Sequence, residues 1–332
     1  MFALLITPVI PLLYLTYFSN KPLVEQTRRR DYVDRTDKAF INFLLTSVMF
    51  CLTCSIKLIS YIMESFDIND KSIVFPEWTV SSLAWFTEFA SVEDLNDVLQ
   101  LSFGLFFTMF YTSLTYFILK PLLCQWVYQE NGSSDYFNNI LAVIALLLMA
   151  QTNYLNVPLF TILFIILFTF QKIIQRQHHE QIFSFSLPLF TILLQNLSFF
   201  QFGSTNTLST VDLTNAFNGL HSYNMIYSGI LTFLTNWSGP IFWSLAYLKL
   251  ASSAASPDFK VNRWNILFDK LIVYLVFYSI GGLLLIGSCF NLRFHLFIWT
   301  VFSPKILYYL SWLGQNLLID FGLSYLVLLF YV

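Results

Sequence analysis

Residues that could support catalysis are few in this 332-residue sequence, which contains only four histidines. His178 and His179 are adjacent, so on a helix their side chains would point about 100° apart and would bind one metal ion poorly. Cys51 and Cys54 have the spacing of a redox pair, but they lie in an apolar run, and we interpret them as small core residues. No His-x-x-x-His, Asp-x-Asp or glycine-rich phosphate loop occurs. The sequence therefore predicts no catalytic residue and no metal site in this chain.

One polar loop, Gly203–Asn224, contains residues suited to binding a polar ligand. Its sequence, GSTNTLSTVDLTNAFNGLHSYN, is rich in amides and hydroxyls, which hydrogen-bond well to sugar hydroxyls or to a phosphate-bearing headgroup. Asp212, Asn215 and Asn218 are spaced i, i+3, i+6, so a helical loop would place them on roughly one face. We consider these three residues candidate substrate-binding residues. The alternative, a capped connecting loop without a ligand, stays open.

A second candidate region begins at Arg293 and His295, where the sequence RFHLFIWTVFSPK enters an apolar stretch. Ionisable groups at membrane depth are costly and often functional, and the guanidinium of Arg293 can bind a phosphate through two hydrogen bonds. We expect Ser303-Pro304 to break the helix, because proline frees backbone groups that then need other partners. The alternative for Arg293 is an interfacial side chain that extends toward lipid headgroups, and we expect the same of Lys57.

The composition indicates which elements must position these residues. Hydrophobic residues make up 57% of the chain and charged residues only 11%, against roughly 25% charged residues in a globular protein. A soluble protein of this size could not bury so much apolar surface, so the surrounding medium must be lipid. The net charge of −2 shows no general attraction for nucleic acid. The sequence therefore predicts an all-α, polytopic transmembrane helical bundle of about 9–10 spans, with residues 1–332 forming a single polytopic membrane domain.

Candidate spans are apolar stretches that approach the roughly 20 residues needed to cross the hydrocarbon layer. The last apolar region, Phe294–Val332, is long enough for two passes. Two earlier spans form a tight helical hairpin around Asn153-Tyr154. The other candidate spans are Met1–Ser19, Ala39–Met63, Val98–Leu119, Asn138–Thr152, Leu155–Gln171, Ile182–Phe202, Met225–Leu248 and Lys270–Phe290.

The distribution of lysine and arginine predicts the orientation, because basic residues are enriched in cytosolic loops. If the spans alternate in direction, one side carries only Lys71 and Arg293, whereas the opposite side is strongly basic. We therefore expect the basic side to be cytosolic and the N-terminus to be lumenal. The basic side carries Lys21, Arg28, Arg29, Arg30, Arg35, Lys38, Lys120, Lys172, Arg176, Lys249, Lys260, Arg263 and Lys270.

The most family-specific part of the sequence is 196–305. It contains the runs NLSFFQFGSTNTLSTVDLTNAFNGL, YNMIYSGILTFLTNWSGPIFW and RFHLFIWTVFSPK. These runs resemble the C-terminal membrane region of the GPI ethanolamine phosphate transferases. The runs FGSTN and STVDLTNA are most similar to the type 2 enzyme. The type 3 enzyme is the next most similar member of the family.

This resemblance implies a multi-pass protein of the endoplasmic reticulum membrane. Members of the family transfer phosphoethanolamine from phosphatidylethanolamine to mannoses of the GPI precursor, and the type 2 enzyme modifies the second mannose. Their lumenal, alkaline-phosphatase-like domain supplies a threonine nucleophile and two zinc ions, and no position in this sequence matches those motifs. We therefore expect no cofactor in this chain and zinc in the missing catalytic domain. The expected partners are the two lipids and a stabilising subunit of the GPI pathway, with no nucleic acid.

The primary hypothesis is that the chain anchors a catalytic domain and presents lipid substrates to it, as a fragment or split part of such an enzyme. A lipid or solute transporter is an alternative. Helices interrupted near Pro240 and Pro304, and the intramembrane residues Asn196 and Asn236, would suit a transport site. A non-catalytic stabilising subunit of GPI biosynthesis is a third hypothesis.

Overall fold

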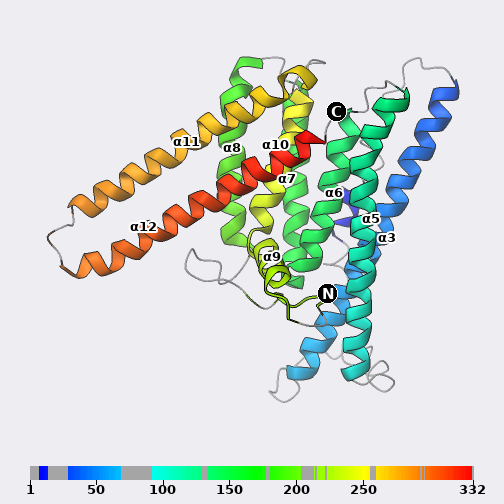
Figure 1. Ribbon diagram of the computed structural model, residues 1–332, viewed down its shortest axis with the longest axis horizontal. Helices are drawn as coiled ribbons and strands as arrows, with labels where there is room; N and C mark the ends of the chain where they lie inside the picture. Colours follow the sequence, from blue (N-terminus) through cyan, green and yellow to red (C-terminus); the bar gives the residue numbers. More distant parts are fainter. Residues whose placement is uncertain are drawn as a thin grey trace. The chain divides into compact units, whose positions relative to one another are not determined.

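All regular elements in the described part of the computed structural model are helical, so the all-α prediction is confirmed for that part. The elements are shown in Figure 1. The structure describes residues 7–13, 29–68, 92–128, 133–176, 180–202, 213, 215–220, 223–254, 259–291, 294 and 296–330. The elements are α2 (Val9–Leu13), α3 (Arg29–Ile68), α5 (Val92–Tyr128), α6 (Ser133–Gln151), η3 (Tyr154–Asn156), α7 (Val157–Arg176), α8 (Glu180–Gln201), α9 (Met225–Asn236), α10 (Ser238–Ala254), α11 (Phe259–Asn291), α12 (Leu296–Leu317), η4 (Leu318–Leu323) and α13 (Ser324–Leu329).

Within the described residues, five helical stretches are long and apolar enough to cross a membrane. This number is lower than the predicted 9–10 spans, but the search covers only the described residues, so the total stays a prediction. The N-terminal orientation also stays a prediction. The apolar helix Tyr136–Gln151 is shorter than these five. The five stretches are Ile41–Tyr61, Asn96–Leu119, Tyr154–Ile174, Trp264–Asn291 and Lys305–Leu329.

The chain divides into two compact units. The first contains Met1–Phe117, Ala142–Phe164 and Leu213–Thr235, and the second contains Ile118–Leu141, Ile165–Asp212 and Asn236–Val332. The prediction of one membrane domain over residues 1–332 is not tested by this division and stays a prediction.

In the second unit, α10 is the central helix, because its residues 238–251 are all buried. A helix that is buried on all sides must be covered by other helices, and α10 contacts α8, η4 and α13. Helix α11 packs against α8 and also against α12. Figure 1 shows α11 and α12 side by side as a long helical pair. These helices surround the candidate site described below.

The predicted helix break around Asn153-Tyr154 is confirmed, and the packing of its two arms as a tight hairpin stays a prediction. Helix α6 ends at Gln151, and the short 3-10 helix η3 leads into α7. The side chain of Asn153 accepts a hydrogen bond from the backbone N–H of Leu155, as an N-cap residue does. This cap begins the second arm.

The predicted span Met225–Leu248 is not one continuous helix, because Trp237 forms a turn between α9 and α10, as expected for a helix interrupted near Pro240. That the stretch crosses the membrane once stays a prediction. Pro240 explains the interruption, since it lacks the N–H that would bond to the carbonyl of Asn236 in a continuous helix. Proline is tolerated in the first turn of a helix, and α10 begins two residues before it, at Ser238.

The break predicted at Ser303-Pro304 is wrong, because α12 continues through both residues. A proline in a membrane helix is tolerated when neighbouring groups bind the carbonyl that it leaves free. Helix α12, η4 and α13 follow one another without a gap from Leu296 to Leu329. The last region is therefore one continuous helical run and not two passes.

Two predictions for α3 need correction. Lys57 does not extend toward headgroups but is buried, and its ammonium donates a hydrogen bond to the carbonyl of Thr152. That carbonyl lies just past the end of α6, where the unpaired carbonyls of a helix attract a cation. Cys51 is exposed rather than in the core, and Cys54 is half-buried.

Candidate functional site

Two consecutive residues of α8, Gln195 and Asn196, take part in two different structures in the second unit. Successive residues on a helix point about 100° apart, so the two side chains contact different neighbours. We name the group Gln195, Tyr247, Lys270 and Asp320 the buried polar centre. We name the hollow beside Asn196 the aromatic recess, and its residues are given below.

The buried polar centre is organised by an ion pair. The Nζ atom of Lys270 on α11 lies 2.6 Å from Oδ1 of Asp320 on η4, and both side chains are fully buried. Gln195 donates from Nε2 to the same carboxylate oxygen. The ammonium of Lys270 also lies 4.6 Å from the centre of the Tyr247 ring on α10. Residues of four elements, α8, α10, α11 and η4, therefore meet at this pair. Each buried charge has an opposite charge and a further polar or aromatic contact, which a buried charge requires.

The π-helical segment η4 positions the carboxylate. Trp312, Asn316, Asp320 and Ser324 are all buried and repeat every four residues. On a regular α-helix such a stripe drifts by about 40° per step, because one turn takes 3.6 residues. A π-helix bonds i to i+5, so each residue turns the chain through a smaller angle. We infer that η4 (Leu318–Leu323) offsets the drift and keeps Asp320 and Ser324 buried.

Small residues bring α8 and α10 into close contact beside the polar centre. A Cβ atom on Gly239 would lie 2.5 Å from Oγ of Ser198 and 3.0 Å from its backbone carbonyl carbon. On the other side of α10, the hydroxyls of Ser244 and Ser324 are 3.1 Å apart, and Ser244 donates to the carbonyl of Ile319 at 3.4 Å. Small and hydroxyl residues are the usual contacts between membrane helices.

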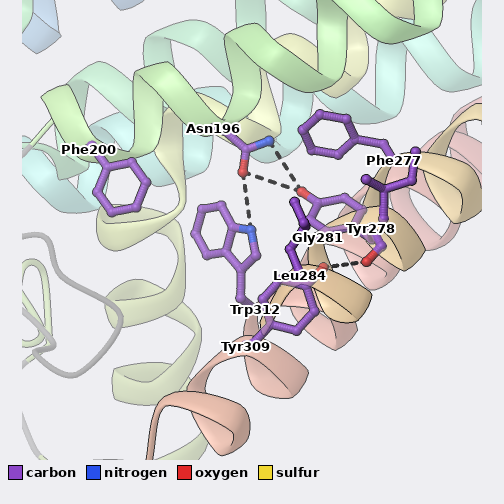
Figure 2. A pocket seen from close by; sticks show the side chains of 9 residues that line it. Asn196, Phe200, Phe277, Tyr278, Gly281, Leu284, Tyr309 and Trp312 are labelled. Carbon is purple, nitrogen blue, oxygen red and sulfur yellow. Dashed lines mark hydrogen bonds between the residues drawn. The ribbon is translucent and has the colours of Figure 1, made fainter. Parts of the chain in front are cut away.

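The aromatic recess is a hollow of about 400 Å³ formed by α8, α11 and α12. Figure 2 shows aromatic rings around Asn196, with Gly281 and Leu284 on α11. The lining is almost entirely apolar. The recess is lined by Asn196, Phe200, Phe277, Tyr278, Ile280, Gly281, Leu284, Tyr309 and Trp312.

Hydrogen bonds fix the polar atoms of the recess to one another, as the dashed lines in Figure 2 show. Oδ1 of Asn196 accepts from the indole Nε1 of Trp312 at 3.1 Å and from the hydroxyl of Tyr278 at 3.4 Å. Nδ2 of Asn196 donates to the carbonyl of Ile192 at 2.7 Å. The hydroxyl of Tyr309 donates to the carbonyl of Tyr278. The surface left to a ligand therefore consists of hydrocarbon and ring faces.

Gly281 permits the close contact between α11 and α12 at the recess. A Cβ atom at this position would lie 2.8 Å from the hydroxyl oxygen of Tyr309, so a side chain here would displace the tyrosine. The neighbouring Gly282 also has only Tyr309 atoms near its missing Cβ, at 3.6 and 4.0 Å. This glycine pair is what allows the Tyr309 ring to lie against α11.

The structure brings together two of the residues predicted to bind substrate. Nδ2 of Asn218 donates to Oδ1 of Asn215 at 3.1 Å in a turn of the first unit, so their spacing does place the two amides side by side. Gly219 ends this turn with φ +75°, and a Cβ there would lie 2.8 Å from the Phe107 ring on α5. Both asparagines are partly exposed. Asp212, Arg293 and His295 lie outside the described residues, and a binding role for all five stays a prediction.

The charged residues of the polar centre were missed as site residues by the sequence analysis. Lys249 and Lys270 were counted on the predicted cytosolic side, at the ends of predicted spans, yet both are buried, and Lys249 lies 5.1 Å from the centre of the Phe168 ring. The signal was present, since Asp320 is an acidic residue inside an apolar stretch and Lys270 begins one. Because charged residues within membrane spans usually pair with one another, these two residues of opposite charge could have been predicted to be in contact.

Metal binding has no support within the described ranges, where no group of three or more His, Cys, Asp or Glu side chains could hold an ion. Zinc in another part of the protein stays a prediction.

The fold and the site define a helical, polytopic membrane protein with an apolar recess. Residues 12–331 match the family described as the GPI ethanolamine phosphate transferase membrane region. A relative from Debaryomyces hansenii, named GPI ethanolamine phosphate transferase 2, is 35% identical over 327 residues, which cover 91% of this chain and 36% of the relative. A Candida albicans protein of the same name is 34% identical over 313 residues, 87% of this chain and 34% of that protein. No solved structure matches the chain.

The chain belongs to the family of GPI ethanolamine phosphate transferase membrane regions. The resemblance to the type 2 enzyme is confirmed, because these relatives carry the type 2 name. The chain spans about a third of the length of these relatives.

Proposed function

We propose that this chain is the membrane part of an enzyme of the endoplasmic reticulum that transfers phosphoethanolamine to the second mannose of the GPI precursor. The match to the family over residues 12–331 carries the proposal. In this proposal the helices anchor a lumenal catalytic domain and hold lipid substrates near it. Holding two membrane reactants together replaces a search between separate molecules by a local encounter. The threonine nucleophile and the zinc ions belong to the longer part of the enzyme.

A chimeric enzyme tests this function. The Debaryomyces hansenii relative receives this chain in place of its matching region and is expressed in Saccharomyces cerevisiae cells that lack GPI ethanolamine phosphate transferase 2. We expect the chimera to restore phosphoethanolamine on the second mannose, as measured by mass spectrometry of GPI precursors, and this chain alone not to restore it. Restoration by the chain alone would contradict the proposal that catalysis takes place in another part of the enzyme. A well-expressed but inactive chimera would contradict the proposal that this chain is the membrane part of such an enzyme.

The polar loop and the start of α12 are the proposed contacts with headgroup or glycan. Asp212, Asn215, Asn218, Arg293 and His295 offer the donors and acceptors that such groups require. In the chimera, alanine substitutions at these positions should reduce transfer while the amount of enzyme stays constant. Unchanged transfer in all five variants would show that the loop is only a connection.

The proposed orientation places the N-terminus in the lumen. A glycosylation site introduced into Glu64–Asp97 should then be modified, and one introduced into Asn20–Lys38 should remain unmodified. The reverse pattern would invert the topology. This experiment is independent of transfer activity, so it tests the anchoring geometry separately.

One observation favours transport as a second candidate function. The turn at Trp237 interrupts the helical run close to Pro240, as in transporters whose binding sites lie between half-helices. Helix α12, however, shows no corresponding break at Pro304. Lipid or solute flux into proteoliposomes containing the purified chain would support transport. A third candidate is a stabilising subunit. It would be supported if expression of this chain in the deficient cells restored the modification only by raising the amount of another GPI-pathway protein.

A further inference from the structure

We infer that the aromatic recess binds one acyl chain of a bilayer phospholipid. The inference does not depend on the reaction proposed above, because it rests only on the lining and the position of the recess. It assigns a lipid-binding site within α8, α11 and α12.

The recess is lined by residues of two candidate membrane-spanning stretches. Its residues on α11 belong to the span Trp264–Asn291, and those on α12 belong to the span Lys305–Leu329. The rim is apolar and exposed, with Phe200, Ile280 and Leu284 at 52%, 55% and 72% exposure. Acyl chains are therefore the groups in contact with this rim.

The chemistry of the lining favours a hydrocarbon over a headgroup. No lysine, arginine or histidine is among the residues that line the recess. The amide of Asn196 is bonded to Trp312 and to the carbonyl of Ile192, and the hydroxyl of Tyr309 is bonded to the carbonyl of Tyr278. A phosphate or a sugar placed here would lose its hydration without gaining comparable hydrogen bonds.

The size of the recess favours one chain rather than a whole lipid. If a methylene group takes roughly the 30 Å³ of a water molecule in the liquid, 400 Å³ holds about a dozen methylenes. Lipid tails are as apolar as the lining, so the attraction comes from van der Waals contact with the rings of the recess. A flexible, linear chain can follow such a surface, whereas a rigid fused-ring lipid requires a wider opening.

The test uses the purified 332-residue chain in nanodiscs that contain phosphatidylcholine with a photoactivatable group on one acyl chain. Mass spectrometry of the irradiated protein should place labels on Phe277–Leu284 and Tyr309–Trp312. Unlabelled phosphatidylcholine should compete, and cholesterol should not. Labels spread evenly along all exposed residues of α11, or equal competition by cholesterol, would overturn the inference.

A matched pair of variants on α11 makes the test specific. Ile280→Trp extends a ring from the rim into the recess and should reduce its labelling about tenfold by excluding the chain. Ile286→Trp introduces the same ring at a position that is 60% exposed but does not line the recess, and it should label like the unchanged protein. Unchanged labelling in Ile280→Trp would contradict the site. If that variant elutes as an aggregate, Leu284→Trp replaces it with the same expectation.

Discussion

The two neighbouring side chains Gln195 and Asn196 show how one membrane helix can contribute to two different environments. Gln195 donates a hydrogen bond to the carboxylate of Asp320. This carboxylate is fully buried and is also paired with Lys270. Asn196 bonds to neutral groups and lies at the edge of an open hollow. The first environment contains charges and no exposed surface, whereas the second exposes apolar surface and contains no charge among its lining residues.

This difference follows from the cost of burying charge. A buried ion pair is stable only if both partners keep their geometry and further hydrogen bonds complete the pair. The buried polar centre must therefore hold α8, α10, α11 and η4 in fixed positions. The neutral amide of Asn196 costs less to bury and can be satisfied locally, which leaves the adjacent apolar surface available to lipid. Substitutions in the polar centre should therefore change stability, and substitutions in the recess should mainly change binding.

The largest effect is expected for Lys270→Met. Removing one partner leaves the carboxylate of Asp320 buried without its cation, and breaking a buried pair in this way typically costs about 3–5 kcal/mol. The free energy of unfolding can be measured by tryptophan fluorescence during SDS titration in mixed micelles. We expect the variant to unfold at clearly lower SDS fractions than the unchanged protein.

A double variant separates the loss of the pair from the loss of packing. Lys270→Met combined with Asp320→Leu replaces both charges by apolar groups, which is often close to neutral. It should recover most of the lost stability. If the single variant is as stable as the unchanged protein, the pair does not fix these helices.

A smaller loss is expected for Gly239→Ala, because the new methyl group would lie 3.0 Å from the backbone of Ser198 and push α8 away from α10. Overpacking of this kind costs about 1–3 kcal/mol. Gly229→Ala on α9 is the matched control, since no atom lies within 4 Å of its Cβ position. The control should be neutral or slightly stabilising, because alanine favours a helix. Equal unfolding curves for the two variants would argue against a tight α8–α10 contact.

The positions of the long helices could be predicted from the sequence, because the apolar length needed to cross a membrane is a local property. Helices α3, α5 and α11 each contain a predicted span, and α7 and α8 each cover nearly all of one. Interruptions were expected near both Pro240 and Pro304, and only the first is present, since the effect of a proline depends on the groups around it. Pro240 lies in the first turn of a new helix, whereas α12 continues through Pro304.

The pairing in the polar centre depends on tertiary packing. Lys270 and Asp320 are separated by 50 residues, and the charge count assigned the lysine to the cytosolic side because it lies at the edge of an apolar run. The recess was partly predicted, because Asn196 was recognised as an intramembrane polar residue. The rings of Tyr278, Tyr309 and Trp312 could not be assigned to it, since aromatic residues are frequent throughout this chain.

On the recess side of α8, Asn196→Ala should lower stability by only about 1 kcal/mol, because hydrogen bonds between membrane helices contribute about 0.6 kcal/mol on average and at most about 1.7. The loss includes the bonds to Trp312 and Tyr278. The same SDS titration measures it. A loss as large as that of Lys270→Met would remove the distinction between the two environments.

The smallest effect is expected for Leu284→Ala at the rim of the recess. This side chain is 72% exposed, so its removal creates no cavity in the protein, and substitutions at such positions usually stay within about 0.5 kcal/mol. The unfolding curve should therefore overlay that of the unchanged chain, while labelling of the recess by the photoactivatable phospholipid decreases because one wall is shorter. A clear loss of stability would show that Leu284 supports the α11–α12 contact, and the recess would then be part of the packing rather than an independent binding surface.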